Sequence, residues 1–501
     1  MAIDSQPQVP QEPVQSPQTL FQQLDRYKGR AGATYSLLPF RFLALDATRF
    51  LLTNFTGELL VLPKEVVRLF VHHRLPIHSD IYYRLKSRHF LIDGDSTVPV
   101  DLLAAKYRTK QAALSQFTSL FMLVTTLRCN QSCVYCQVSG RSENEHRFDM
   151  TEPVADAAVD FMFRSPSSLI KVEFQGGEPL LHFDLVKHIV RSVEQRNASA
   201  HRDIEFVIAT NLSRLTEEVI HFCRDHNVYF STSLDGPCDL HNRNRPSFGH
   251  GSYKDVVSGI RRVQDTLGPQ RISALMTSTR ASLQRPREIV DEYVHQGFSS
   301  IVLRTLHPYG RAAVLGTGIG YSIDEWLQFY REALRYILEL NSQGIVLREA
   351  TAVLLLRKIL TPWATRYVDL QSPAGIGIAG IVINYDGNVY CSDEARMLAE
   401  MGDQKFLMGD ILSDQYKGIM LSEALLSPLE ETLTECMPQC SDCGIQPYCG
   451  SDPVRHYRSQ GDMVGFKPAS DFCKMHLGLV KHLVRLLEDE PAAAKILRTW
   501  I

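Results

Sequence analysis

The stretch FMLVTTLRCNQSCVYC, residues 121–136, joins a strand-like apolar run to three closely spaced cysteines. Cys129, Cys133 and Cys136 follow the run 121–127 almost directly. A closed structural zinc site and a ferredoxin-type cluster each take four protein ligands, so a centre held by three keeps one coordination position open. Thiolates are soft ligands that suit zinc, copper(I) and iron–sulfur clusters. The stretch therefore predicts a metal centre on a loop that follows a strand.

The segment that begins with this stretch alternates strand-like and helix-like runs. The apolar runs predict strands at 121–127, 169–175, 203–210, 228–234, 271–279 and 299–306. Helical segments are predicted near 151–163, 182–195, 214–226, 252–266, 284–296 and 322–342. Six strand–helix units in series indicate a parallel sheet covered by helices, fewer than the eight units that close a full barrel. We expect an α/β fold, a partial (β/α)6 barrel, with its site at the carboxyl ends of the strands.

Other regions flank the expected barrel. The N-terminal residues are rich in Pro and Gln and predict disorder, and the residues after them mix strand-like and helix-like runs, which is typical of a small α+β domain. The sequence IVINYDGNVYC, residues 381–391, predicts a hairpin that turns at Asp386 and Gly387, and a helix is predicted near 476–490. We expect a disordered tail, an α+β domain, the barrel, a cysteine-rich region and a C-terminal helix, at residues 1–19, 20–115, 116–345, 346–480 and 481–501.

Composition argues against several classes of protein. Hydrophobic residues make up 44% of the chain and charged residues 22%, and the net charge is -3, which does not suggest a partner of nucleic acid or a membrane surface. No secretory signal is visible, and the longest near-apolar run, 374–383, is too short to span a bilayer. We expect a cytoplasmic protein, in which clustered cysteines bind metal rather than form disulfides.

The spacing of the first cysteines resembles that of the radical S-adenosylmethionine (SAM) enzymes. The matching pattern is C-x3-C-x2-C, with Tyr135 before its last cysteine. In that family the three cysteines, here Cys129, Cys133 and Cys136, hold a [4Fe–4S] cluster whose open iron chelates SAM. The reduced cluster splits SAM into methionine and a 5′-deoxyadenosyl radical. Taken without this resemblance, the residues also allow a zinc site completed by a remote fourth ligand.

The segment QGGEPLLH after the second expected strand resembles the family's GGE motif. The resemblance implies that this motif meets the SAM amino group, and glycine allows the backbone to approach a ligand closely. An ordinary glycine turn is the alternative. The residues concerned are Gly176, Gly177, Glu178 and Pro179.

The segments ATNLS and SLDGP end the third and fourth expected strands and resemble SAM-binding segments of peptide-modifying members of the family. The resemblance implies that Asn211, Ser233 and Asp235 bind SAM, and a turn or capping role is the alternative for each. The candidates for a SAM-carboxylate partner are Arg243 and Arg245, and a surface arginine is the alternative for each. Arg304, on the sixth strand, is a further candidate for the mouth of the barrel.

The cysteine-rich region resembles SPASM, the auxiliary-cluster extension of many radical SAM peptide maturases. The resemblance implies that at least one auxiliary [4Fe–4S] cluster is held by Cys440, Cys443, Cys449 and Cys473. The family has a further cysteine where this chain has Pro453, and another before the hairpin, where this chain has none. Either a second auxiliary site uses non-cysteine ligands, or the two remaining cysteines of the region are spare. These are Cys391 and Cys436. Structural zinc is the alternative for the whole group.

The N-terminal sequence YSLLPFRFLALDATRFLLTNFTGELLVL, residues 35–62, narrows the resemblance. Together with the barrel and the altered cysteine tail, it is similar to the first of the two paired radical SAM maturases of the His-Xaa-Ser peptide system. The implied substrate is a small, ribosomally made protein with His-Xaa-Ser repeats. The implied partners are a second radical SAM maturase and a reductase or flavodoxin-type electron donor.

Two further expectations rest on the same resemblance. The N-terminal domain is similar in element order to leader-peptide-binding modules, whose exposed strand edge pairs with an extended peptide; a domain that only caps the barrel is the alternative. Asp393, two positions after the hairpin cysteine, is a candidate general base, and a solvated acidic turn is the alternative.

Two other functions compete with peptide modification of this kind. One is formylglycine formation by a sulfatase maturase, which shares the barrel and the type of tail. The other is a catalytically silent metal-binding scaffold that presents a peptide to a partner maturase. The intact cysteine triplet and GGEP segment favour an enzyme, because a binding module has no use for an open metal position.

Overall fold

The computed structural model describes residues 35–94, 96–247 and 251–501. The expected disordered tail, residues 1–19, lies outside the described residues. No helix in the described part of the chain is both long enough and apolar enough to cross a membrane.

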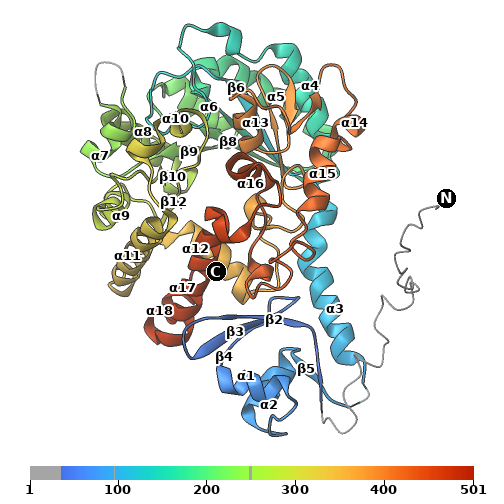
Figure 1. Cartoon of the computed structure of the whole chain (residues 1–501). Coiled ribbons are helices and arrows are strands. Elements are labelled where there is room, and N and C mark those ends of the chain that lie inside the picture. The colour runs from blue at the N-terminus through green and yellow to red at the C-terminus, as the bar shows by residue number, and fades with distance from the viewer. Residues whose placement is uncertain (1–34, 95, 248–250) are drawn as a thin grey trace, which may run out of the picture.

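A large sheet forms the centre of the molecule, and among the described residues it has nine strands in the order β12-β10-β9-β8-β7-β6-β14-β15-β16 (Figure 1). The strands from β6 to β12 in this order are parallel to their neighbours and follow one another along the chain. Their bounds are β6 Leu120–Thr126, β7 Leu169–Gly176, β8 Asp203–Ala209, β9 Val228–Ser233, β10 Ile272–Thr277 and β12 Leu303–Arg304. The expected α/β class with a parallel sheet is confirmed. The sixth expected strand is divided, because the short β11 (Ser300–Ile301) pairs instead with β13 (Arg348–Glu349).

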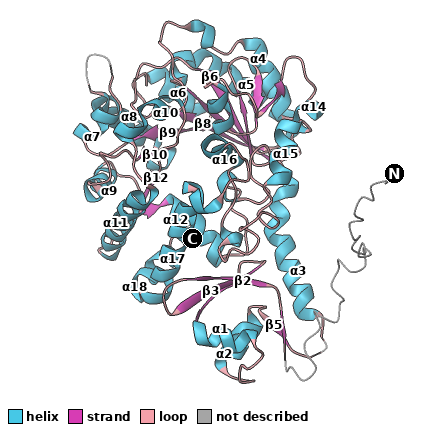
Figure 2. Cartoon of the chain, viewed as in Figure 1, coloured by secondary structure: helices cyan, strands magenta, loops and turns pink. Residues whose placement is uncertain are grey.

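Helices cover the outside of the parallel strands (Figure 2). Each packs through apolar residues spaced three or four apart. One of them, α11 (Ile323–Ser342), buries Trp326, Leu327, Tyr330 and Leu334, and it starts with a capping box at Ser322. The helices are α4 Glu152–Met162, α5 Phe183–Ala200, α6 Glu217–Asp225, α8 Ser252–Leu267, α9 Pro286–His295 and α11 Ile323–Ser342. Two further helices, α7 Cys238–Asn244 and α10 Gly310–Ile319, lie in the connections that follow β9 and β12.

The expected hairpin is present, but it belongs to the central sheet. Strands β14 (Gly380–Ile383) and β15 (Asn388–Tyr390) pair antiparallel, and β14 also pairs in parallel with β6. The strand β16 (Leu407–Asp410) then pairs with β15. The sheet therefore includes strands from beyond the expected domain boundary at residue 346. The helix that follows the hairpin, α13 (Asp393–Ala399), is thereby placed next to the barrel.

The remaining C-terminal elements are helices around the cysteine-rich loops. They are α12 Ala350–Leu360, α14 Tyr416–Met420, α15 Glu423–Glu431, α16 Pro453–Gln460, α17 Asp471–Asp489 and α18 Pro491–Arg498. The helix expected near 476–490 begins earlier, at Asp471, where Ser470 caps it by accepting a hydrogen bond from the backbone of Cys473. This early start places Cys473 on the first turn of α17.

The N-terminal domain has its own small core and lies against the cysteine-rich loops. The core includes Leu52, Phe70, Tyr82 and Phe90. Its elements are β1 Ser36–Leu37, β2 Phe40–Ala44, β3 Arg49–Asn54, β4 Leu59–Pro63, α1 Lys64–Val71, α2 Asp80–Ser87 and β5 Leu91–Ile92, and α3 Val98–Gln111 leads to the barrel (Figure 1). Contacts with the loops include the Thr53 hydroxyl donating to the Gly444 carbonyl (2.9 Å) and the Tyr448 hydroxyl donating to the Gly57 carbonyl (2.8 Å).

Candidate active site

The loop with the first three cysteines leaves the carboxyl end of β6 and is held by backbone hydrogen bonds. The Cys129 amide donates to the Arg141 carbonyl (2.9 Å), and the Val134 amide donates to the Asn244 carbonyl (2.9 Å). From the other side, the Arg311 amide donates to the Cys136 carbonyl (2.8 Å). The loop is thus positioned by β6, α7 and α10 together.

The three cysteines line a hollow of about 1010 Å³, measured with its opening to solvent, at the carboxyl ends of the parallel strands. This hollow, called the central cavity below, is where parallel α/β folds place ligands. The residues singled out from the sequence that line it are Cys129, Cys133, Cys136, Tyr135, Gly176, Gly177, Asn211, Ser233, Arg245, Arg304 and Asp393. Three others lie behind its wall, namely Glu178, Pro179 and Asp235.

The two glycines after β7 allow the backbone to pack directly on the cysteine loop. A Cβ on Gly176 would lie 2.3 Å from the Thr126 carbonyl oxygen, and one on Gly177 would lie 2.1 Å from the Arg128 carbonyl oxygen. Gly176 also has a φ of +126°, which a side chain would disfavour. Close approach between two chain segments therefore requires glycine here, and the same backbone faces the cavity.

Glu178 organises the cavity wall from behind. It is 1% exposed, and its carboxylate accepts hydrogen bonds from the Thr210 hydroxyl (2.6 Å) and from the amides of Asn211 (2.8 Å) and Leu180 (3.0 Å). Burial raises its pKa, and these hydrogen bonds oppose the rise. With three donors bound, Glu178 positions the turn after β8, where the Asn211 side chain in turn donates to Asn130 (2.9 Å) in the cysteine loop.

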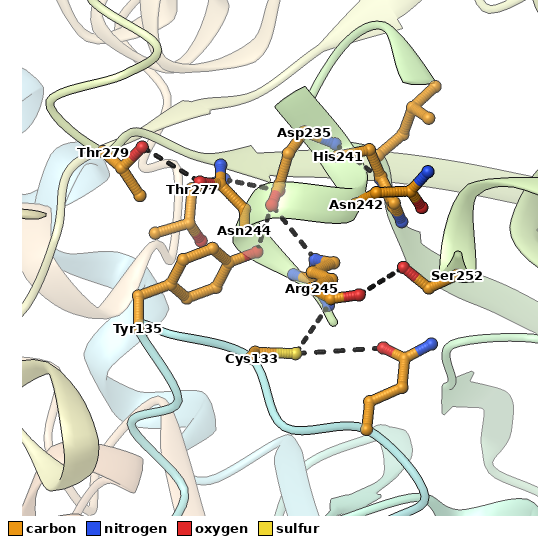
Figure 3. A network of polar contacts seen from close by, with 12 residues as sticks. Cys133, Tyr135, Asp235, His241, Asn242, Asn244, Arg245, Ser252, Thr277 and Thr279 are labelled. Atoms are coloured by element: carbon orange, nitrogen blue, oxygen red, sulfur yellow. Dashed lines mark hydrogen bonds and ion pairs between the residues drawn. The ribbon is translucent and has the colours of Figure 1, made fainter. Parts of the chain in front are cut away.

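A buried polar network joins the cysteine loop to β9 and α7 (Figure 3). Asp235 is fully buried, and its carboxylate accepts hydrogen bonds from the Tyr135 hydroxyl (2.6 Å) and from Nε of Arg245 (3.2 Å). Nη1 of Arg245 lies 3.9 Å from Sγ of Cys133, and the guanidinium stacks over the Tyr135 ring. Arg245, rather than Arg243, is therefore the arginine at this site, and Asp235 neutralises it.

Burial in the loop favours the neutral thiol over the thiolate, so thiolates here need a bound cationic centre to offset their charge. Burial raises the pKa of the Cys133 thiol to about 11, and the guanidinium of Arg245 opposes this rise. Among the described residues, no three His, Cys, Asp or Glu side chains converge so that they could hold a single metal ion. An iron–sulfur cubane instead takes each thiolate on a different iron. Three thiols around a hollow are compatible with such a cluster.

The second group of cysteines surrounds a separate hollow of about 930 Å³, measured with its opening. One stretch of loop contributes the thiols of Cys440, Cys443 and Cys449, and the first turn of α17 contributes that of Cys473. Burial raises the pKa of Cys440 to about 11, and Lys467 opposes this rise. The structure thus brings together the four cysteines expected to share a cluster.

The other two cysteines of the region line neither hollow. Cys391 is fully buried at the end of β15, and Cys436 is exposed. The structure brings neither of them to the other four.

Asp393 lies at the start of α13 and lines the central cavity. Its Oδ1 accepts hydrogen bonds from Nε and Nη2 of the fully buried Arg396 (3.2 Å each), so the carboxylate is paired rather than solvated. The acidic turn expected as the alternative is therefore part of a buried ion pair.

Several cavity residues were missed in the sequence. Glu173 and Gln175 alternate with buried Val172 and Phe174 along β7, so they point into the barrel, and Nε2 of Gln175 has no hydrogen-bond partner in the described structure. The signal in the sequence for this orientation is the polar residue at every second position of the strand. Met397, on α13, also lines the cavity, and no pattern in the sequence marked it.

Comparison with known proteins finds a family model that matches part of the chain. The model of the radical SAM superfamily matches residues 123–302. An uncharacterized protein of Methanocaldococcus jannaschii is 28% identical over 188 residues, which are 37% of this chain and 62% of that protein. The cysteine-type anaerobic sulfatase-maturating enzyme of Clostridium perfringens is 25% identical over 134 residues, 25% of this chain and 35% of the enzyme.

Solved structures share the fold over a longer span. The structure of anSMEcpe with bound AdoMet superimposes with a TM-score of 0.61 at 15% identity, covering 76% of this chain and 99% of that one. Streptococcus suis SuiB bound to S-adenosylmethionine gives a TM-score of 0.52 at 14% identity, covering 87% and 98%. Residues 123–302 of the chain are therefore similar to the radical SAM superfamily, and the fold, which extends beyond these residues, is similar to those of anSMEcpe and SuiB.

Proposed function

We propose that the chain is a radical SAM enzyme that modifies a ribosomally made peptide. The observation that carries this proposal is the placement of Cys129, Cys133 and Cys136 around a cavity that the bare backbone of Gly176 and Gly177, packed on the cysteine loop, also lines. These three cysteines would hold a [4Fe–4S] cluster, which in this family supplies the electron that splits SAM into methionine and a 5′-deoxyadenosyl radical.

The chain's own residues would bind and orient the SAM molecule. The backbone after β7 leaves room for the amino acid end of SAM, and Asn211 and Ser233 offer hydrogen-bonding groups at the ends of β8 and β9. The cysteine loop is fixed in position next to the end of β9 by the hydrogen bonds that Tyr135 and Arg245 donate to Asp235. Asp393 offers a proton acceptor on the wall formed by α13.

The glycine wall provides a direct test of this binding mode. Gly177→Ala is expected to weaken SAM binding by about tenfold or more, because the added methyl group would collide with the Arg128 carbonyl and shift the wall against the cluster. Gly418→Ala is the matched control, since no atom lies within 4 Å of its added carbon. Titration calorimetry of cluster-loaded protein with SAM measures both variants. Equal losses, or no loss, in the two would contradict the proposed wall.

The second cysteine group would hold an auxiliary [4Fe–4S] cluster. Its four thiols share one hollow, and Lys467 and Lys474 line the same hollow. Positive charge near thiolates favours their ionised, metal-binding form. An auxiliary cluster would give the enzyme a second redox group, to which a reductase or a flavodoxin-type donor would deliver electrons.

The proposed substrate is a protein with His-Xaa-Ser repeats, processed in the cytoplasm together with a second radical SAM maturase. Peptide modification is supported by two of the similar structures, since anSMEcpe was solved with the Kp18Cys peptide and SuiB with the precursor peptide SuiA. Formylglycine formation on a sulfatase peptide is the second candidate, favoured by the similarity to the Clostridium perfringens enzyme. A silent scaffold has less support, because its cysteine loop would not need an open cavity.

The deciding experiment is an assay for 5′-deoxyadenosine. Protein purified anaerobically and loaded with iron and sulfide is mixed with SAM and a strong reductant, alone, with a His-Xaa-Ser repeat protein, or with a sulfatase peptide. Product that rises with the repeat protein supports the proposal, and a rise with only the sulfatase peptide supports formylglycine formation. No product under any condition, from protein shown to contain the cluster, supports the scaffold.

The N-terminal sheet offers an edge for a leader peptide. Among the described strands, β4 pairs with β3 on one side only, whereas the other edge strand, β2, lies against Gly444 of the cysteine-rich loop. Extended peptides add to free strand edges through backbone hydrogen bonds. We therefore place the leader peptide on β4.

Hydrogen exchange tests this placement. Binding of a His-Xaa-Ser precursor is expected to slow amide exchange in residues 59–62 by roughly tenfold or more, because new hydrogen bonds protect amides of this strand. Residues 49–54 of β3 already have a strand on each side and should not change. A bound peptide that leaves residues 59–62 unprotected would show that the domain only caps the barrel.

A further inference from the structure

A group of charged side chains lies behind the wall of the central cavity, around Cys391. Its carboxyl groups belong to Asp369, in the short helical turn Val368–Leu370, to Glu394 in the first turn of α13, and to Asp452, which caps α16. We call these three residues the carboxyl cluster. Nη2 of Arg304, a cavity residue, lies 4.0 Å from Oε1 of Glu394. The carboxyl cluster is therefore one side chain removed from the cavity.

The surroundings of Cys391 do not suit an iron–sulfur cluster. The charged groups that raise the pKa of its buried thiol are Glu394 and Asp452, added to the effect of burial, and no other cysteine contributes. Cys436, the other cysteine that lines neither hollow, is exposed. It lies near Tyr107 on α3, whose pKa it helps to raise, and it does not contribute to the pKa of Cys391. A thiolate-bound cluster here would place further negative charge among three carboxyl groups, which like-charge repulsion opposes.

The carboxyl cluster itself is built to keep a proton. Burial raises the pKa of Glu394 to about 7, helped by Asp369 and Asp393 and opposed by Arg304. Burial also raises the pKa of Asp452 to about 7, helped by Glu394 and opposed by Arg455. When buried carboxyl groups repel one another, one of them stays protonated to higher pH than an isolated carboxyl group.

Two polar atoms beside the carboxyl cluster lack partners. Nδ1 of His307 lies 3.8 Å from Oε1 of Glu394, and His307 is 8% exposed. The hydroxyl of Tyr309 is fully buried, and its pKa is raised by burial, Asp452 and Glu394. Neither atom has a hydrogen-bond partner in the described structure. Unsatisfied polar atoms at a buried site mark a place for water or an exchanging proton. The charged and titratable groups around the cluster are Arg304, His307, Tyr309, Tyr367, Cys391, Asp393 and Arg455.

We infer that the carboxyl cluster takes the place of a second auxiliary iron–sulfur site, and that it holds one exchangeable proton behind the cavity, beside the unpartnered Nδ1 of His307. In the exchange, a proton leaves a group bound in the cavity and the carboxylate of Glu394 becomes a carboxylic acid, with no electron transferred. The inference rests on the proposed function only in taking the central cavity as the site where SAM and the substrate bind.

Iron content tests the first part. The loaded protein is expected to hold about eight iron atoms per chain, from two [4Fe–4S] clusters. Cys391→Ala and, as a more conservative change, Cys391→Ser should keep all eight, because neither removes a ligand. About twelve iron atoms in the unaltered chain, or a loss of about four in both Cys391 variants, would overturn the inference.

Infrared spectroscopy tests the second part on the full-length protein. The carbonyl absorption of protonated carboxyl groups should fall as the pH rises through about 7, since a raised pKa keeps the acid form below that pH and loses it above. Glu394→Gln should remove this pH-dependent change, and Glu394→Asp should keep it. Glu400→Gln, just after α13 and paired with Arg141, is the matched control and should leave the change intact. A change that persists in both Glu394→Gln and Asp452→Asn would overturn the exchangeable proton of the cluster.

These measurements need neither SAM nor a peptide, so their failure is distinct from failure of the proposed function. Iron missing from the cysteine triplet would refute the proposed function and leave the infrared result standing. Iron lost with Cys391 would refute the inference and leave the proposed function standing.

Discussion

Replacing Cys129, Cys133 and Cys136 together by alanine is expected to reduce 5′-deoxyadenosine formation to the rate seen without protein. The physical reason is that these thiols are the only protein groups proposed to hold the SAM-binding cluster, and without it no electron reaches SAM. The variant should also lose about four iron atoms per chain and keep about four in the auxiliary site. Iron analysis and chromatography of the assay mixture measure the two effects independently.

The fold should survive this triple substitution. The three side chains line an open cavity rather than the packed core, and the loop that carries them is held by backbone hydrogen bonds that alanine preserves. Cys238→Ala is the matched control, because Cys238 is exposed and lies on α7, away from the cavity lining. It should leave product and iron unchanged. A folded triple variant that still forms 5′-deoxyadenosine would refute the proposed site.

The barrel could be predicted from the sequence because its signals are local. Apolar strand-like runs and helical segments alternate along residues 121–342, and each strand of the parallel sheet pairs with its neighbour in the chain. The cysteine triplet and the glycine pair also lie in single short segments. Their placement at strand ends then follows from the geometry of parallel sheets.

Features that depend on distant parts of the chain could not be predicted in this way. The pairing of β14 with β6 joins residues far apart in the sequence, and nothing local to residues 380–383 indicates it. The choice of Arg245 over Arg243 depends on which side of α7 faces Asp235 and Cys133. The residues around Cys391 come from several separate segments of the chain. The spacing of the cysteines in the sequence could therefore show only that some of the usual cluster ligands are absent.

Asp235→Asn is expected to lower the free energy of unfolding of the barrel by about 3–5 kcal/mol. The substitution keeps the side-chain shape and removes its charge, which leaves the guanidinium of Arg245 buried without a counter-ion. The hydrogen bond from the Tyr135 hydroxyl is weakened at the same time. Urea unfolding of the metal-free protein, followed by circular dichroism, measures the change, and Asp235→Asn with Arg245→Met should recover part of it.

Asp239→Asn is the matched control for this effect. Asp239 follows Asp235 closely in the chain and also pairs with an arginine, Arg285, but its side chain is 72% exposed. Exposed ion pairs contribute about 1 kcal/mol or less, because water solvates both charges when the pair is broken. If Asp235→Asn cost no more than Asp239→Asn, Arg245 would have to be solvated in the folded protein. Its charge would then be screened from Cys133, and the guanidinium could not offset the burial that raises the pKa of that thiol.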